Sequence, residues 1–182
     1  MKLENSFEVP SPPAEAWRVL LDIERIAPCM PGATLTEAVD DKTYKGEVSV
    51  RLGPVALTFS GTAKFEEIDD ANHRALVKAQ GSDSKGRGGA NAEIAFRLEP
   101  FGDGSRVVVE TDLVLSGSIA QYGRGVGMIQ SVAGQLVGEF ATNLEAELQK
   151  SEAAPAEAAK PISGLALMWR ALLDAIRGIF RR

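Results

Sequence analysis

Apolar and polar side chains alternate with period two through much of this chain. Between residues 33 and 117 the alternation is broken only by turn residues, which is typical of an antiparallel meander. A similar run near the N-terminus ends at Pro10. The pattern therefore predicts seven strands, at residues 2–9, 33–39, 42–52, 55–67, 74–84, 90–99 and 105–117.

Helical periodicity appears in two places. Pro12 and Pro13 favour a helix start, and Ser11 is expected to cap this short helix. Residues 120–148 repeat apolar side chains at helical spacing, which predicts the longest helix. A sheet in this order can bury one face only if it curves around that helix. We expect an α+β helix-grip fold, a seven-stranded curved antiparallel sheet wrapped around a long C-terminal helix.

The pattern divides the chain into three segments. Residues 1–149 are predicted to form the helix-grip domain, and residues 150–160, rich in alanine, glutamate and proline, a linker. Residues 161–182 are predicted to form a separate amphipathic helix. This segment contains four arginines and one aspartate, so its net charge is +3, whereas the whole chain has a net charge of −5. The tail is therefore basic and the rest of the chain acidic.

The amphipathic tail is expected to lie in a membrane surface, because its apolar arc is flanked by arginines. The residues expected to contact the membrane are Leu165, Trp169, Arg170, Leu172, Leu173, Ile176, Arg177, Phe180 and Arg181. Docking onto a partner protein uses the same pattern and remains the alternative.

Small residues are unusually frequent at the strand positions expected to face inward. They include Gly46, Gly61, Ala79, Gly81 and Ala92. Because protein interiors are close-packed, missing side chains indicate either a cavity or a close approach of backbone. The first alternative predicts an apolar ligand, and the second predicts glycines at bulges and beneath the helix.

Several short motifs together resemble one family. They are Pro28-Cys29-Met30-Pro31-Gly32-Ala33, Tyr44-Lys45-Gly46, Gly53-Pro54-Val55, Phe59-Ser60-Gly61, the glycine-rich residues 86–89 and Gly117-Ser118-Ile119-Ala120-Gln121-Tyr122-Gly123-Arg124. In combination the motifs resemble the CoxG family of carbon monoxide dehydrogenase subunits, within the START-like SRPBCC superfamily, over about residues 1–149. The resemblance implies an accessory protein of a molybdenum hydroxylase such as carbon monoxide dehydrogenase. It also implies a cavity for a lipid, polyketide or quinone.

The expected ligand is an apolar small molecule, either a quinone such as menaquinone or ubiquinone or another lipid. Cys29 and Met30 could contact the quinone ring at the cavity mouth, and Tyr122 could donate a hydrogen bond to its carbonyl; packing and surface roles are the alternatives. The expected cavity residues are Cys29, Met30, Pro31, Gly32, Phe59, Gly61, Ala79, Phe96, Tyr122, Met128, Val132 and Leu136.

The chain offers little for catalysis or metal binding. Cys29 is the only cysteine and His73, expected in a turn, the only histidine, so no metal cluster of these residues can form. Charged strand residues such as Glu66 and Arg97 are expected on the outer face. The acidic, ordinary composition also argues against nucleic-acid binding. We expect neither catalytic nor metal-binding residues.

These observations predict a cytoplasmic binding protein, peripheral on the inner face of the membrane. It would recruit a molybdenum hydroxylase and link it to membrane quinone. The alternatives are an enzyme of the cyclase or hydrolase kind acting on an apolar substrate, which would need polar groups inside the cavity, and a structural assembly factor, which would need no cavity.

Overall fold

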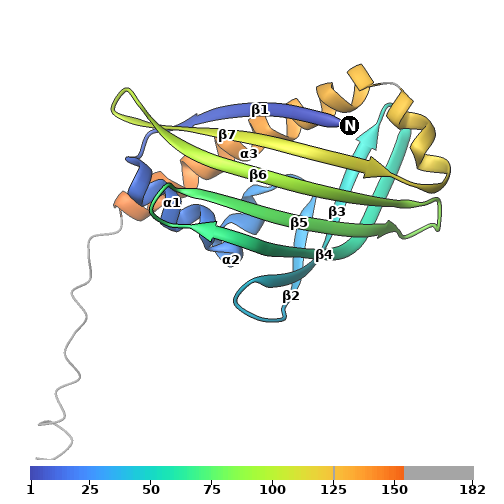
Figure 1. Ribbon diagram of the computed structural model, residues 1–182, viewed down its shortest axis with the longest axis horizontal. Coiled ribbons are helices and arrows are strands. Elements are labelled where there is room, and N and C mark those ends of the chain that lie inside the picture. Colours follow the sequence, from blue (N-terminus) through green and yellow to red (C-terminus); the bar gives the residue numbers. More distant parts are fainter. Residues whose placement is uncertain (125, 154–182) are drawn as a thin grey trace, which may run out of the picture. The chain divides into compact units, whose positions relative to one another are not determined.

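The computed structural model describes residues 1–124 and 126–153 of the chain. Seven strands form one antiparallel sheet, and the long C-terminal helix runs along it (Figure 1). The chain divides into two units, Met1–Gln149 and Lys150–Arg182, and the sheet belongs to the first. The predicted tail helix at 161–182, with its membrane-contacting residues, and the linker from residue 154 lie outside the described residues.

The strands begin and end within two residues of their expected bounds. They are β1 (Lys2–Val9), β2 (Ala33–Ala38), β3 (Thr43–Leu52), β4 (Val55–Asp69), β5 (Arg74–Asp83), β6 (Gly89–Phe101) and β7 (Gly104–Leu115). Their order across the sheet is β1-β7-β6-β5-β4-β3-β2. Hairpins join β2 through β7, whereas β1 pairs with β7, so β1 and β2 are the two edges.

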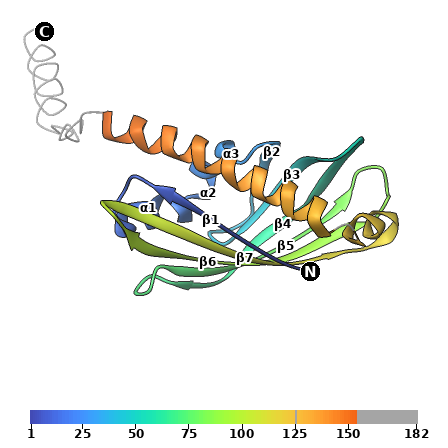
Figure 2. The same ribbon diagram turned by 90° about the horizontal axis from the view of Figure 1, so that it is seen from above.

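Five helical segments complete the described chain. They are α1 (Pro13–Leu21), α2 (Ile23–Ile26), the 3₁₀ turns η1 (Ala27–Cys29) and η2 (Gly117–Arg124), and α3 (Val126–Ala153). The view from above in Figure 2 shows α3 lying along one face of the sheet. With seven antiparallel strands and this helix, the predicted helix-grip fold is confirmed.

The bounds of the long helix differ from the predicted 120–148. Residues 117–124 form the 3₁₀ turn η2 instead, and α3 begins at Val126. Several glycines fall in this stretch, and each costs an α-helix about 1 kcal/mol relative to alanine. At the other end α3 continues to Ala153, four residues into the predicted linker. Lys150, Glu152 and Ala153 are good helix formers, which accounts for this extension.

The predicted cap of α1 was wrong. Pro12 is the N-cap residue, and no side chain caps the helix. Ser11 is buried one residue further back, where its carbonyl accepts a hydrogen bond of 2.6 Å from Ser105 Oγ. The second proline accounts for the shift, because the helix begins at Pro13.

Two separate clusters of buried side chains form the core. The large cluster joins α1, the C-terminal half of α3 and one end of the sheet, and includes Trp17, Phe65, Leu98, Phe140 and Leu144. The small cluster lies at the other end, around the β3–β4 hairpin and η2, and consists of Leu52, Leu57 and Ile119. Along β4, Leu57 belongs to the small cluster and Phe65 to the large one, so the middle of the strand faces neither.

The C-terminal half of α3 is fixed to the rest of the domain by polar contacts as well. Asn143 donates a hydrogen bond of 2.9 Å to the carbonyl oxygen of Cys29. The Arg25 guanidinium lies 3.4 Å from the carboxylate of Glu147. Phe140 packs edge-on against Phe7, with ring centroids 5.7 Å apart. These contacts attach α3 to η1, α2 and β1.

Candidate functional site

A cavity of about 440 Å³ lies on the concave side of the sheet, in the gap between the two core clusters. Strands β2 to β7 contribute to its wall, α2 and η1 border it, and α3 contributes Leu136. Its lining residues are Ile23, Ala27, Ala33, Thr34, Leu35, Tyr44, Lys45, Gly46, Val48, Phe59, Gly61, Thr62, Ala63, Ala79, Gln80, Gly81, Ala90, Ala92, Ile94, Leu113 and Leu136.

Two adjacent rows of small residues create this space. Strand pairing aligns Gly46, Gly61, Gly81 and Ala90 in one row, and Ala63, Ala79 and Ala92 in the next. Bulky side chains return on either side of these rows. The Val48–Phe59 pair lies on one side, and Phe65 pairs with Val77 on the other. The cavity is thus the part of the concave face where neighbouring strands lack large side chains together.

The glycines and the alanines of these rows have different roles. A Cβ atom on Gly61 would lie 1.9 Å from the carbonyl oxygen of Gln80, and one on Gly46 would lie 2.7 Å from that of Thr34. Both clashes are with the adjacent strand, so these glycines permit a close approach of strand to strand. The alanines already carry a Cβ atom and limit how far the wall projects. Both explanations of the small residues therefore apply, each to different positions.

Four of the predicted cavity residues line the cavity. Phe59, Gly61 and Ala79 come from the central strands, and Leu136 faces them from α3. They come together because the odd positions of β4 and β5 share the concave face and pair directly, as in Gly61–Gly81 and Ala63–Ala79. Whether these residues bind a ligand stays a prediction.

Residues 28–32, the motif that precedes β2, do not line the cavity. Cys29 is 5% exposed and belongs to the large cluster, with Met30 packed against the same cluster. Pro31 is partly buried. Gly32 adopts a φ of +72° beside the backbone of Ser49, where a Cβ atom would lie 2.4 Å from the Ser49 oxygen. The prolines turn the chain into β2, and the thiol packs into the core, so the expected ring contact with Cys29 has no support from this placement.

The remaining predicted residues lie beyond the two ends of the cavity. Phe96 packs on Trp17 at a centroid distance of 5.8 Å. Tyr122 and Val132 pack against the small cluster, while Met128 is 46% exposed. The late start of α3 explains part of this difference, because η2 places Tyr122 in a 3₁₀ turn rather than in the long helix.

Sequence reasoning missed the α2–β2 side of the cavity, formed by Ile23, Ala27, Ala33, Leu35 and Tyr44. The alternation of Ala33 and Leu35 around Thr34 was the available signal, because it continues the inward parity of β3 onto the edge strand. The contribution of α2 and η1 had no signal in the local pattern.

Tyr44 brings a phenol hydroxyl to the described cavity wall. Its hydroxyl donates a hydrogen bond of 3.0 Å to the carbonyl oxygen of Asp41. Burial raises the pKa of Tyr44, and the nearby Asp41 carboxylate adds to the shift. Thr34, Lys45, Thr62 and Gln80 also border the cavity, at strand positions that alternate with the inward ones.

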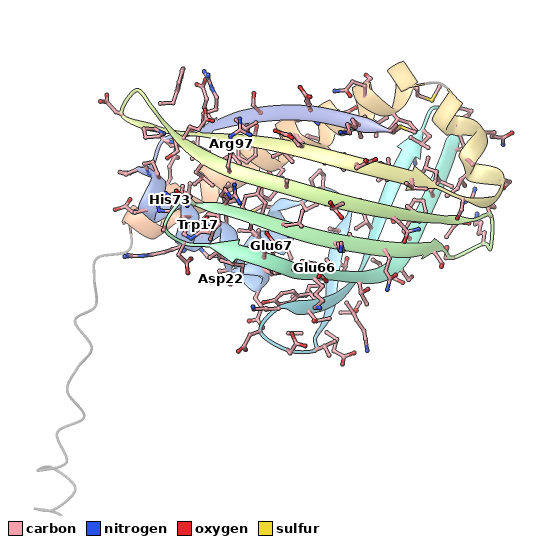
Figure 3. The ribbon with its side chains drawn as sticks, viewed as in Figure 1. Trp17, Asp22, Glu66, Glu67, His73 and Arg97 are labelled. Carbon is pink, nitrogen blue, oxygen red and sulfur yellow. The ribbon has the colours of Figure 1, made fainter. Side chains whose placement is uncertain are left out.

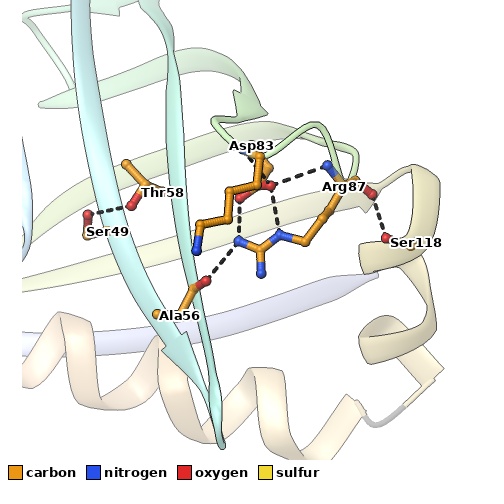
Figure 4. A network of polar contacts seen from close by, with 7 residues as sticks. Ser49, Ala56, Thr58, Asp83, Arg87 and Ser118 are labelled. Carbon is orange, nitrogen blue, oxygen red and sulfur yellow. Dashed lines mark hydrogen bonds and ion pairs between the residues drawn. The ribbon is translucent and has the colours of Figure 1, made fainter.

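A buried ion pair between Asp83 and Arg87 lies near the small cluster (Figure 4). Asp83 pairs with Phe59 across the strands, and its carboxylate, 0% exposed, accepts two hydrogen bonds of 2.8 Å from the Arg87 guanidinium. Arg87 also donates to the carbonyl oxygen of Ala56, while Ser118 Oγ donates to the Arg87 carbonyl oxygen, each at 2.8 Å. This network ties the β5–β6 loop to the β3–β4 hairpin and to η2.

Residues 6–149 match the family model of CoxG, a subunit of carbon monoxide dehydrogenase. The chain belongs to the CoxG family. Comparison with curated proteins found no match to this CoxG-family chain.

Solved structures similar to this CoxG-family chain share its fold at low sequence identity. A conserved protein from Geobacillus kaustophilus has a TM-score of 0.72 and 22% identity, covering 83% of this chain and 97% of that one. The ZhuI aromatase/cyclase from Streptomyces sp. R1128 has a TM-score of 0.58 and 14% identity, covering 89% and 99%. Ara h 8.0201 has a TM-score of 0.53 and 16% identity, covering 82% and 98%.

Charged side chains of the CoxG-family domain pair with one another on the strands. Arg97 bonds Glu99 at 2.9 Å and Glu110 at 3.1 Å, and Lys64 lies 3.2 Å from Glu66. Figure 3 labels Glu66 and Arg97 on the face of the sheet turned toward the viewer. The described residues contain no group of three or more histidine, cysteine, aspartate or glutamate side chains that could hold a metal ion.

Trp17 and His73 lie together at the end of the sheet that holds the large cluster (Figure 3). The Trp17 indole donates a hydrogen bond of 2.8 Å to Asp70, and its ring centroid lies 5.7 Å from that of His73. His73 occupies the β4–β5 turn with a φ of +48°, as the turn residues before it indicated. This cluster fastens α1 to the sheet, away from the cavity wall.

Proposed function

We propose that this CoxG-family chain is an accessory binding protein of a molybdenum hydroxylase of the carbon monoxide dehydrogenase type. It holds a quinone or another lipid in the cavity, and its tail brings the complex to the cytoplasmic face of the membrane. The cavity of about 440 Å³, with a wall of apolar side chains, is the observation that carries this proposal. Family membership supports the association with the dehydrogenase.

A binding role suits the wall better than catalysis does. A catalytic site needs titratable groups within hydrogen-bond reach of the substrate. The described wall has two titratable residues: the Tyr44 hydroxyl is bonded to backbone, and Lys45 pairs with Glu37 at 2.9 Å. A tyrosine hydroxyl is protonated at neutral pH, and burial moves the pKa of Tyr44 further above that range.

The membrane part of the proposal rests on the sequence of residues 161–182. None of the described helices is long and apolar enough to span a membrane. An amphipathic helix with arginines beside its apolar arc binds an anionic surface through both charge and apolar burial. Association with the membrane would then require no spanning helix.

Lipid extraction tests the binding role. Mass spectrometry of lipids extracted from the purified full-length protein should find a quinone or related lipid at near-stoichiometric amounts. The Ala79→Leu variant should retain much less of it, because the larger side chain projects into the cavity. Equal lipid retention by both proteins would contradict the assignment of the cavity.

Vesicle sedimentation tests the tail. A truncation after Ala153 keeps the whole of α3 and should retain its lipid, yet it should no longer sediment with anionic vesicles. Added salt should weaken vesicle binding of the full chain only in part, since apolar burial is not screened. If both proteins sediment equally and only the full chain co-purifies with a dehydrogenase, the tail is a protein-docking helix.

A further inference from the structure

The described cavity wall has almost nothing with which to recognise a polar head group. Among the described residues, no buried side-chain nitrogen or oxygen lacks a hydrogen-bond partner. The Tyr44 hydroxyl already donates to Asp41. A polar group placed deep in the cavity would therefore lose its bonds to water and gain few in return.

The size of the cavity suits a hydrocarbon chain. At about 30 Å³ for a group the size of water or methylene, its volume of about 440 Å³ accommodates roughly fifteen such groups. Leucine, isoleucine, valine, phenylalanine and alanine side chains supply contacts along its length. Each methylene buried there contributes to affinity without any directional bond.

The rim beside Tyr44 is acidic. A smaller pocket next to the cavity is lined by Asp22, Glu24, Asp40 and Asp41, and it shares Ile23 and Tyr44 with the cavity. Arg25, the cation on α2, faces Glu147 instead. Lys42 lies in the same turn as Asp40 and Asp41, and Lys45, which lines the cavity, pairs with Glu37, so the four carboxylates leave the rim with a net negative charge.

We propose that the cavity selects a long, uncharged hydrocarbon chain, leaves the head group of its ligand at the rim, and discriminates there against anionic head groups. This inference rests on the proposed lipid-binding function and names the ligand class: a neutral lipid recognised by its chain. A quinone would then bind through its prenyl tail rather than through its ring.

Competition binding with the full-length protein tests the inference. The four probes are a ring-only naphthoquinone, the same ring with a farnesyl chain, hexadecanol and ionised hexadecanoate. The ring-only compound should bind about 100-fold more weakly than the farnesylated one. Hexadecanol should match the farnesylated quinone within about threefold, and hexadecanoate at low salt should bind about tenfold more weakly than hexadecanol.

The rim is tested by the double variant Glu24→Gln/Asp41→Asn. This variant should bind hexadecanoate almost as tightly as it binds hexadecanol, and its affinity for hexadecanol should equal that of the wild-type protein. Asp103→Asn, in the β6–β7 turn, is the control and should change neither. Because the Asp41 group bonded to Tyr44 is its backbone carbonyl, the variant keeps that contact.

Ring-only binding as tight as that of the farnesylated quinone would overturn the selection of the chain. Equal binding of hexadecanoate and hexadecanol to the wild-type protein at low salt would overturn the role of the rim. Both results leave lipid binding intact. If no long-chain compound binds, the proposed function itself fails.

Discussion

The Arg87 guanidinium covers both carboxylate oxygens of Asp83 with hydrogen bonds of 2.8 Å. The backbone N–H groups of Lys85 and Arg87 donate to the same carboxylate at 3.1 and 3.2 Å. The hydrogen bonds from the Arg87 side chain are the main reason why the pKa of Asp83 lies far below its usual 3.8. The buried carboxylate is thus compensated by a cationic side chain and by two backbone donors of the loop after β5.

Acid should weaken the ion pair between Asp83 and Arg87. A carboxyl whose pKa is lowered by folding contributes stability above its unfolded pKa, and this contribution is lost as pH falls below about 3.9. Asp83→Asn should be less stable than wild type at neutral pH, because Arg87 loses its charged partner. Urea midpoints measured from pH 7 downward should show the gap between the two proteins narrowing below about pH 4. A gap independent of pH would contradict the role of the Asp83 charge.

Substitutions in the two rows of small residues should separate folding from cavity volume. Ala79→Leu places its added atoms in the cavity and should leave the unfolding midpoint near that of wild type while lowering lipid retention. Gly61→Ala adds a single methyl group that meets the Gln80 carbonyl oxygen, and it should cost about 1–3 kcal/mol of unfolding free energy. Chemical denaturation with lipid analysis measures both, and a destabilised Ala79→Leu with a tolerated Gly61→Ala would reverse the assignment.

Two leucines of α3 offer a matched comparison. Leu144 is 1% exposed within the large cluster, so Leu144→Ala should cost about 2–5 kcal/mol. Leu136 already faces the cavity, and Leu136→Ala should cost clearly less because fewer contacts are lost. Urea unfolding of both variants checks the order. Equal losses would mean that the space beside Leu136 is filled by protein.

Gly138 of α3 should be replaceable with a gain in stability. A Cβ atom there meets no heavy atom within 4 Å, so Gly138→Ala should stabilise the protein by about 1 kcal/mol through helix propensity. Gly104→Ala is the contrasting variant, since its Cβ atom would lie 2.2 Å from the Val9 carbonyl oxygen. Thermal melting should move in opposite directions for the two variants.

The sheet was predictable from the sequence because its signal is local. Alternation with period two fixes which side chains share a face, and turn residues fix the hairpins, so strands with simple hairpins such as β5 followed directly. The start of the long helix was less predictable, because the apolar period continues through glycines that weaken an α-helix. The Ser11 cap failed for a similar reason, since the second of two prolines began the helix.

The cavity was predictable only in part. Gly61 and Ala79 could be assigned to its wall because strand parity extends over the whole sheet. Cys29 could not be placed, because its orientation depends on how η1 packs against α1 and α3, which no local pattern records. Ile23 and Ala27 reach the cavity through the same tertiary packing. The parts of the site that sequence reasoning found lie on the regular strands β4 and β5 and on the regular helix α3, where side-chain direction follows from a local period.

The division of the core into two clusters decides how the domain behaves when it is empty. Buried side chains such as Leu144 and Phe65 hold one end together, and Leu57 and Ile119 hold the other, without help from whatever occupies the space between them. Each cluster is closed by its own side chains, so the two ends of the sheet keep their packing whether the space between them is filled or empty.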